Sequence, residues 1–338
     1  MEAQAVEREG GMNGLEKLVL REGGWSAEVY LYGAHVTSWK SSQGEELLFL
    51  SSKALFEPPK AIRGTAAASP SASRSSPTSA PFLPTASPAT ASGPSTPIPN
   101  STPLPTPLQP SSISFFLLLL LLLTTISKPI PTGASITSNS YLSFFFSLPL
   151  PNFFSSFEYR LRVQLGPAGL LTLTSRVRNT NSDGKPFSFT FAYHTYFSVS
   201  DISEVRVEGL ETLDYLDNLQ DRSRFTEQGD AITFEGELDR IYLEAPRKIA
   251  ILDHEKNRTF VVIKDGLPDA VVWNPWDKKA KAMSDFGDEE YKHMVCVEAA
   301  AIEDPVTLKP TEEWTGRLQL SLVPNTHVGG SLDVPNAL

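Results

Sequence analysis

The composition of this 338-residue chain changes abruptly at Pro58 and again at Phe157. Between these two residues there is no aspartate or glutamate, and residues 65–112 hold twelve of the 27 prolines among serine, threonine and alanine. A segment of this kind has too little apolar surface to bury, so it predicts disorder. The sequence on either side has the mixed charged and apolar composition of a globular protein.

These changes divide the chain into four parts. We predict one domain in two pieces, separated by a low-complexity insert and followed by a tail. The pieces of the domain are residues 12–64 and 157–325, the insert is 65–156, and the tail is 326–338.

The second half of the insert is apolar. Nine consecutive apolar residues run from Phe115 to Leu123, and a further patch follows at Leu142–Phe146. A membrane-spanning helix needs about 20 apolar residues, so we expect no membrane span. Serine, proline, leucine and phenylalanine have pyrimidine-rich codons. We therefore hypothesise that 65–156 is a retained intron or a mis-joined gene model, which sequencing of the transcript would test; a genuine disordered linker is the alternative.

Charge and cysteine content limit the class of partner and the compartment. The net charge is −10, and the two pieces of the predicted domain contain no cluster of lysine and arginine. We therefore expect no nucleic-acid binding. Cys296 is the single cysteine, which excludes an intrachain disulfide and favours a reducing compartment. Residues 1–24 lack the apolar core of a secretory signal. The sequence predicts a cytoplasmic protein.

Short alternating segments separated by turns recur on both sides of the insert. They are typical of strands, whereas helical patterns are few. No repeat of fixed length is present, which argues against a propeller. The sequence predicts an all-β sandwich whose strands include residues 25–32, 36–39, 157–165, 170–178, 187–199, 248–253, 258–264 and 313–323.

One histidine lies within the dense aromatic strand at 187–199. Alternation places Phe189, Phe191 and Tyr193 on one face of this strand and His194 on the other. Histidine is the side chain whose ordinary pKa allows proton exchange near neutrality, so His194 is a candidate acid–base group. A buried structural histidine is the alternative at this position.

Four further features are candidates for chemistry. Glu298 ends an apolar strand, where burial would raise its pKa and make it a general base, although a rim glutamate fits equally well. Asp239 beside Arg240 interrupts an alternating run and could be an exposed strand pair. The two tryptophans of 271–276 suit either a sugar-stacking floor or the core. Arg63 could hold a phosphate or hydroxyl groups.

Several common motifs are missing. The chain has no GxGxxG, P-loop, HExxH or GxSxG sequence. Its five histidines are scattered, and with one cysteine they show no zinc-type spacing. We therefore expect neither a metal nor a nucleotide cofactor.

Six ordered motifs resemble those of plant-type glucose-6-phosphate 1-epimerases, which are hexose-6-phosphate mutarotases related to aldose 1-epimerases. The resemblance covers about 12–64 and 157–325. It implies a galactose-mutarotase-like β-supersandwich without a cofactor, and an isomerase that interconverts the α and β anomers of glucose 6-phosphate. Separately, we expect a monomer. The motifs are Gly33–Trp39, Phe56–Gly64, Phe191–Phe197, Leu238–Tyr242, Val271–Trp276 and Cys296–Ala300.

The resemblance also assigns roles to four residues. His194 matches the catalytic histidine of the family and Glu298 its catalytic base. Asp239 matches a sugar-binding aspartate, and Arg63 matches the arginine of an Arg-Gly-Gly motif near the substrate.

The chain departs from the family pattern directly after Arg63. Relatives continue with a Gly-Ile-Pro…Phe-Pro-Gln-Phe-Gly loop and a His-Gly-Phe-Ala-Arg motif, and both are replaced here by the serine- and proline-rich tract. These pieces carry substrate-binding residues in relatives. Two alternatives therefore stay open, namely a catalytically impaired sugar-binding protein and a β-sandwich interaction module.

Overall fold

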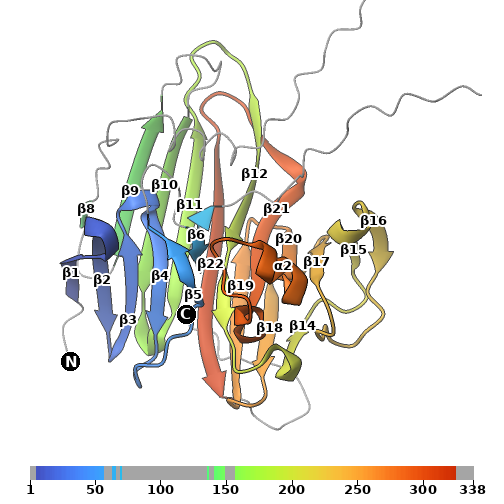
Figure 1. Ribbon diagram of the computed structural model, residues 1–338. Helices are drawn as coiled ribbons and strands as arrows, with labels where there is room; N and C mark the ends of the chain where they lie inside the picture. Colours follow the sequence, from blue (N-terminus) through green and yellow to red (C-terminus); the bar gives the residue numbers. More distant parts are fainter. Residues whose placement is uncertain are drawn as a thin grey trace, which may run out of the picture.

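The computed structural model describes residues 5–56, 63–65, 69–70, 135–136, 141–148 and 157–324. Its described part consists mainly of β-strands, arranged in two large sheets, a four-stranded sheet and a two-stranded sheet (Figure 1). The all-β supersandwich predicted from the sequence is confirmed.

The first large sheet has eight antiparallel strands. It joins the segments on the C-terminal side of the insert to two strands from within the insert's predicted range. Its order is β14 (Val205–Glu208), β18 (Lys248–Asp253), β19 (Arg258–Asp265), β22 (Glu313–Pro324), β11 (Leu171–Asn179), β10 (Phe157–Leu165), β9 (Tyr141–Leu148) and β8 (Ser135–Ile136).

The second large sheet carries the candidate residues His194, Asp239, Trp273 and Glu298. The short strand β13 (Tyr196–Ser198) continues β12 (Phe187–His194) beyond Thr195 and also pairs with β21 (Met294–Leu308). The order of the sheet is β16 (Ser223–Thr226), β15 (Asp214–Asp217), β17 (Leu238–Tyr242), β20 (Asp269–Asn274), β21 (Met294–Leu308), β12 (Phe187–His194) and β7 (Ser69–Pro70).

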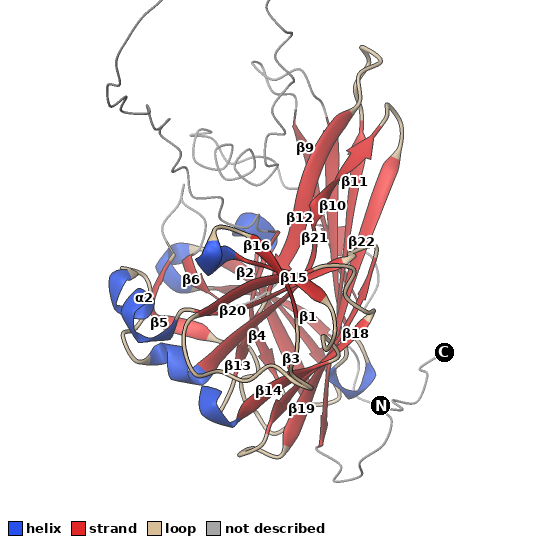
Figure 2. Ribbon diagram, turned by 90° about the vertical axis from the view of Figure 1, so that its right-hand side faces the viewer, coloured by secondary structure: helices blue, strands red, loops and turns tan. Residues whose placement is uncertain are grey.

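The N-terminal residues form the two small sheets, and the helices are all short. Most of these helices gather along one side of the strands (Figure 2). The strands are β1 (Ala5–Gly10), β2 (Glu16–Glu22), β3 (Trp25–Tyr30), β4 (His35–Lys40), β5 (Leu50–Leu55) and β6 (Arg63–Thr65). The helices are α2 (Trp276–Ala282) and the 3-10 turns η1 (Met12–Gly14), η2 (Tyr32–Ala34), η3 (Pro167–Gly169), η4 (Ile202–Glu204), η5 (Asn218–Gln220) and η6 (Glu290–His293).

The main core lies between the two large sheets, and β12 turns its aromatic face toward it. Phe189, Phe191 and Tyr193 are all buried there. Trp314 of β22 packs on both phenylalanines, with ring centroids 5.4 and 4.9 Å away. The alternation predicted for this strand is confirmed, and it leaves His194 on the opposite face.

Part of the predicted insert is strand. β9 pairs with β10 along its whole length, and its Leu142 is buried in the core. The rest of 65–156, including the leucine run at 117–123, lies outside the described residues apart from Thr65, β7 and β8, so its disorder and its origin stay predictions. Within the described ranges, no helix has the length and apolar character needed to span a bilayer.

A buried hydroxyl network anchors the strand that carries His194. The Tyr193 hydroxyl donates to Ser175 Oγ at 2.7 Å and lies 3.2 Å from the carbonyl oxygen of Gly316. Tyr193→Phe removes the donor and leaves buried acceptors, so we expect it to lower the free energy of unfolding by about 1–3 kcal/mol. Urea unfolding measures this loss, and a variant as stable as the wild type would contradict it.

Candidate active site

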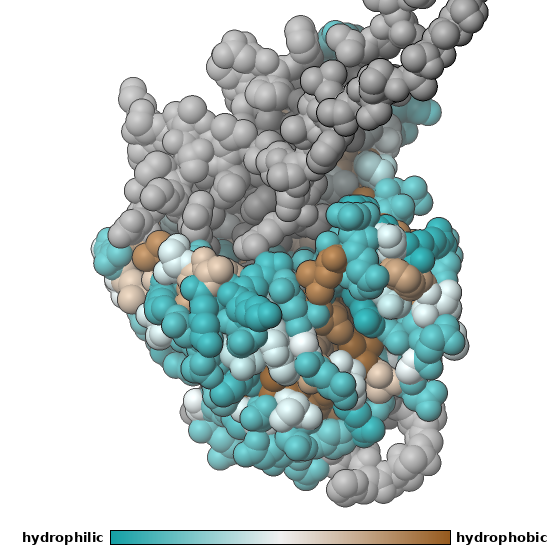
Figure 3. Space-filling model, turned by 45° about the vertical axis from the view of Figure 1, so that its right-hand side comes forward, coloured by the Kyte–Doolittle hydropathy of each residue, from teal (hydrophilic) through white to brown (hydrophobic). Residues whose placement is uncertain are grey.

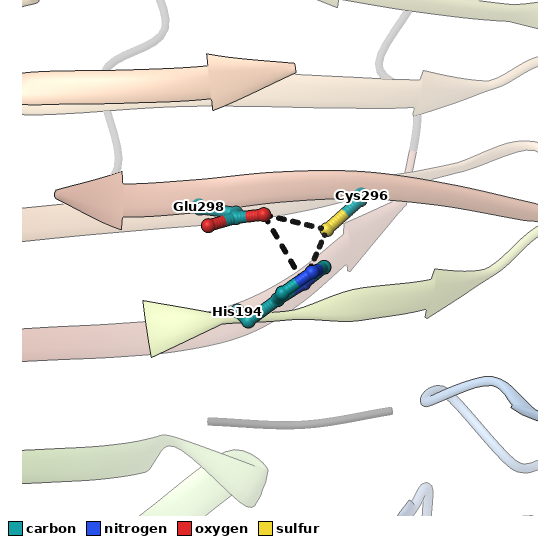
Figure 4. A group of neighbouring side chains, drawn as sticks. All are labelled: His194, Cys296 and Glu298. Atoms are coloured by element: carbon teal, nitrogen blue, oxygen red, sulfur yellow. Dashed lines mark hydrogen bonds and ion pairs between the residues drawn. The ribbon is translucent and has the colours of Figure 1, made fainter. Parts of the chain in front are cut away.

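His194 and Glu298 meet on the face of the second sheet opposite to Phe191 and Tyr193. His194 ends β12, and Glu298 lies in the neighbouring strand β21. His194 Nδ1 is 3.1 Å from Glu298 Oε1, and the exposed fractions of the two side chains are 28% and 6% (Figure 4). The structure thus brings together the two residues predicted as acid and base.

Cys296 is the third member of the cluster. It precedes Glu298 by two positions, so both side chains leave β21 on the same face. Its Sγ lies 3.0 Å from His194 Nδ1 and donates to Glu298 Oε1 at 3.4 Å (Figure 4). The sequence analysis used Cys296 only as evidence about disulfides. Its spacing from Glu298 was the available signal that it shares the site.

Two aromatic side chains fix the histidine ring. The Tyr196 ring stacks on His194 with centroids 4.6 Å apart and planes inclined by 5°, and its hydroxyl lies 3.4 Å from Nε2. Trp273 meets the imidazole edge-on at 6.3 Å. Trp276 instead packs on Tyr291 at 5.3 Å. Of the two tryptophans predicted as sugar floor or core, Trp273 therefore borders the site.

The register of the sheet places Asp239 in the same row as the cluster. Asp239 pairs with Trp273, which pairs with Cys296, which pairs with Tyr196. Paired residues share a face, so the Asp239 side chain lies two strands, or about 10 Å, from that of Cys296. The amide of Asn218 in η5 donates to Asp239 Oδ1 at 2.7 Å, a contact that the sequence pattern did not indicate.

Arg240 points to the other face of β17 and has a structural role. Its Nη1 lies 2.9 Å from Glu227 Oε2, and its guanidinium lies 4.4 Å from the centre of the Tyr215 ring. The hydroxyl of Tyr242 donates to the same Glu227 oxygen at 2.8 Å. Asp239 and Arg240 are therefore not an exposed strand pair, since both are half-buried and they belong to different environments.

Arg63 is placed only by its backbone. It pairs with Leu55 in the two-stranded sheet, and Ser69, six residues later, pairs with His194. Six extended residues span at most about 20 Å, which keeps the Arg63 backbone within that distance of Ser69. The prediction that its guanidinium contacts substrate concerns a side chain outside the described part.

The surroundings of Glu298 favour its protonated form. Burial raises the pKa of Glu298 to about 8; the Cys296 hydrogen bond opposes this rise, and the negative charge of Asp239 adds to it. Burial likewise raises the pKa of the Cys296 thiol well above its ordinary value, with Glu298 as a further cause. The site therefore holds a carboxyl group that exchanges its proton near neutral pH.

The face around this cluster is otherwise apolar. A second group of buried hydrophobic residues lies on it, and this group consists of Ala192, Leu216, Ile241, Leu243, Val271, Ala300 and Ile302. On the side of the molecule seen in Figure 3, hydrophobic residues gather in a hollow between hydrophilic ridges. An imidazole and a carboxyl group in contact on such a face can give one proton and take another within the same small molecule. In the described ranges, His194, Cys296 and Glu298 are also the one group whose donor atoms could hold a metal ion.

Comparison with known proteins identifies the family. The family model described as "Aldose 1-epimerase" matches residues 133–321. A "Putative glucose-6-phosphate 1-epimerase" from Cenchrus ciliaris is 56% identical over 324 residues, which cover 95% of this chain and 89% of that protein. The chain belongs to the aldose 1-epimerase family. The resemblance noted from the sequence motifs is thereby confirmed.

A bacterial relative and two solved structures extend the comparison. A "Putative glucose-6-phosphate 1-epimerase" from Escherichia coli is 35% identical over 136 residues, or 40% of this chain and 45% of that protein. The crystal structure of a "putative mutarotase" from Salmonella typhimurium matches with a TM-score of 0.66 at 23% identity, covering 94% of both chains. A galactose mutarotase-like protein from Clostridium acetobutylicum matches with a TM-score of 0.59 at 16% identity, covering 96% of this chain and all of that one. These structures share the fold.

Proposed function

We propose that this member of the aldose 1-epimerase family is a hexose-6-phosphate mutarotase that interconverts the α and β anomers of glucose 6-phosphate. The observation that carries the proposal is the contact between His194 Nδ1 and Glu298 Oε1 at 3.1 Å. The names of its relatives from Cenchrus ciliaris and Escherichia coli supply the substrate.

The reaction needs an acid and a base side by side. In a cyclic hexose, the C1 hydroxyl and the ring oxygen are bonded to the same carbon. We assign removal of the C1 hydroxyl proton to the Glu298 carboxylate and protonation of the ring oxygen to the His194 imidazolium. The C1–ring-oxygen bond breaks as a carbonyl forms at C1. Rotation about C1–C2 and the reverse proton transfers close the other anomer, with no net change in either side chain.

The remaining contacts define what each residue does during this cycle. Among the described residues, His194 and Cys296 both contact Oε1 of Glu298, so we assign Oε2 to the sugar. The stacked Tyr196 ring and the edge of Trp273 hold the imidazole plane fixed. Asp239, oriented by Asn218, is placed to accept hydrogen bonds from sugar hydroxyls. We assign Arg63 to the 6-phosphate, on the strength of its motif.

The intact acid–base pair favours this function over both alternatives. A sugar-binding protein without activity would need no proton-donating and proton-accepting groups in contact, and an interaction module would need no such site. The cytoplasmic location and the monomeric state remain predictions from the sequence.

Polarimetry tests the proposed substrate. Freshly dissolved α-glucose 6-phosphate should reach anomeric equilibrium faster with the protein than without it, and the acceleration should exceed that for glucose. Arg63→Ala should raise KM for glucose 6-phosphate but change the rate with glucose little, because the Arg63 guanidinium is assigned to the phosphate. If neither glucose 6-phosphate nor glucose reaches anomeric equilibrium faster with the protein than without it, the proposal is refuted.

The pH profile reports the ionisation of Glu298. Because the carboxylate is the base, kcat/KM should fall about tenfold per pH unit below a pKa of about 8. Asp239→Asn should move this acidic limb to lower pH, since the Asp239 charge helps to raise the pKa of Glu298. Measurement of kcat/KM from pH 5 to pH 9 checks both statements. If the acidic limb of Asp239→Asn lies at the same pH as that of the wild type, the Asp239 charge does not raise the pKa of Glu298.

A further inference from the structure

We propose that the acid–base cluster also binds a thiophilic divalent cation such as Zn²⁺, through His194 Nδ1, Cys296 Sγ and a carboxylate oxygen of Glu298, and that this ion inhibits the enzyme. Figure 4 shows the three donor groups converging from two neighbouring strands. Binding itself is independent of the proposed function, whereas the inhibition rests on it.

The spacing of the three donor atoms is close to that of a tetrahedral site. Sγ to Nδ1 is 3.0 Å, Sγ to Oε1 is 3.4 Å, and Nδ1 to Oε1 is 3.1 Å. Bond lengths of about 2.0–2.2 Å to nitrogen and oxygen and about 2.3 Å to sulfur place tetrahedral zinc ligands about 3.3–3.6 Å apart. Side-chain rotations that separate the donors by a few tenths of an ångström would therefore admit the ion without moving the strands.

The chemistry of the donors selects the kind of ion. A thiolate with an imidazole favours zinc, cobalt and similar ions over magnesium and calcium, which prefer oxygen ligands. Three protein ligands with a fourth position for water or a substrate oxygen is the usual pattern of an open zinc site. Asp239, on the same face, adds negative charge that attracts a cation.

Inhibition follows from the atoms that the ion would occupy. As the sulfur–metal bond forms, the Cys296 thiol proton passes to water. The imidazole uses the Nδ1 lone pair for the metal, and the carboxylate uses one oxygen. An imidazole bound through Nδ1 cannot also be the imidazolium that protonates the ring oxygen, and the cation lowers the basicity of the whole carboxylate, so proton transfer to and from the sugar slows.

The sequence predicts no metal site because its histidines and its cysteine lack the short, fixed spacing of compact zinc motifs. His194 and Cys296 are 102 positions apart, whereas Cys296 and Glu298 are two apart. Pairing of β13 and β12 with β21 brings these distant positions together. A spacing rule for compact zinc motifs misses such a site.

Cobalt titration of the whole chain tests the site directly. Because Cys296 is the single cysteine, a cobalt–thiolate charge-transfer band reports this site alone. We expect the band to saturate at one Co²⁺ per chain and to be displaced by Zn²⁺. We also expect Zn²⁺, but not Mg²⁺, to slow anomer exchange, and a chelator to restore it.

Two variants separate the site from unspecific binding. Cys296→Ala should abolish the band. His194→Gln, at a partly exposed position, keeps the thiol and should weaken cobalt binding at least about 10-fold, since even outer-shell partners of a metal are worth that much. No cobalt–thiolate band in the wild type, or equal affinity in wild type and His194→Gln, would overturn the site. Full anomer exchange with zinc bound would overturn the inhibition. A chain that shows the cobalt band on titration but catalyses no anomer exchange when metal-free would instead count against the proposed function alone.

Discussion

Glu298→Gln is expected to reduce catalysed anomer exchange by about 10²–10⁴-fold, and His194→Gln by a similar factor. Glutamine keeps the size of the glutamate side chain but cannot accept the C1 hydroxyl proton. In place of His194 it cannot protonate the ring oxygen. Because the two groups act in one step, the double variant should be little slower than either single variant. Exchange rates at saturating glucose 6-phosphate measure these losses.

Matched controls change the same residue types, and one of them lies on the same strand as Glu298. Glu303→Gln changes an exposed glutamate of β21 that pairs with Arg222 at 3.0 Å. His293→Gln changes a histidine whose Nδ1 contacts the carbonyl oxygen of Ser200. Both control variants should keep wild-type exchange. If Glu298→Gln or His194→Gln were as active as these controls, the assignment of acid and base would be wrong.

The second large effect concerns stability, and Glu298→Gln is expected to be more stable than the wild type at neutral pH. The pKa of Glu298 is about 8 in the folded protein, against an ordinary value of 4.5. Between these values the unfolded chain has released this proton while the folded chain retains it. Rising pH therefore favours unfolding, by up to about 1.4 kcal/mol per pH unit.

Glutamine has no proton to release, so it removes this pH dependence. The stability advantage of Glu298→Gln should grow from about pH 4.5 to about pH 8 and then stay constant, because both states are ionised above the folded pKa. Urea unfolding of both proteins at several pH values measures it. Glu303→Gln should show no such trend, and a constant difference between Glu298→Gln and wild type would contradict burial as the cause.

The alternation of a strand made half of this site predictable. On β12, Phe189, Phe191 and Tyr193 required one buried face, which placed His194 on the other. Glu298 was picked out instead as a carboxylate that ends an apolar strand, but β21 continues past it to Leu308. The partnership between them was not contained in either local pattern, since it depends on which strands pair. The motif resemblance supplied that information in place of geometry.

Contacts between distant strands account for what the sequence reasoning missed. Cys296 lies beside His194 because β21 pairs with both β12 and β13. Asn218 reaches Asp239 from a short 3-10 turn that follows the capping residue Asp217 and that the sequence analysis did not predict. The strand Tyr141–Leu148 lacks polar alternation, so only its pairing with β10 reveals it.

The most direct measurement is magnetisation transfer between the α and β anomeric protons of glucose 6-phosphate at equilibrium. Equilibrium exchange needs no coupling enzyme and reports the proposed reaction itself. With the 338-residue chain, transfer should exceed the spontaneous rate in proportion to protein concentration, and with His194→Gln/Glu298→Gln it should return to that rate. Transfer at the spontaneous rate with the wild-type chain, or equal transfer in the double variant, would contradict the account.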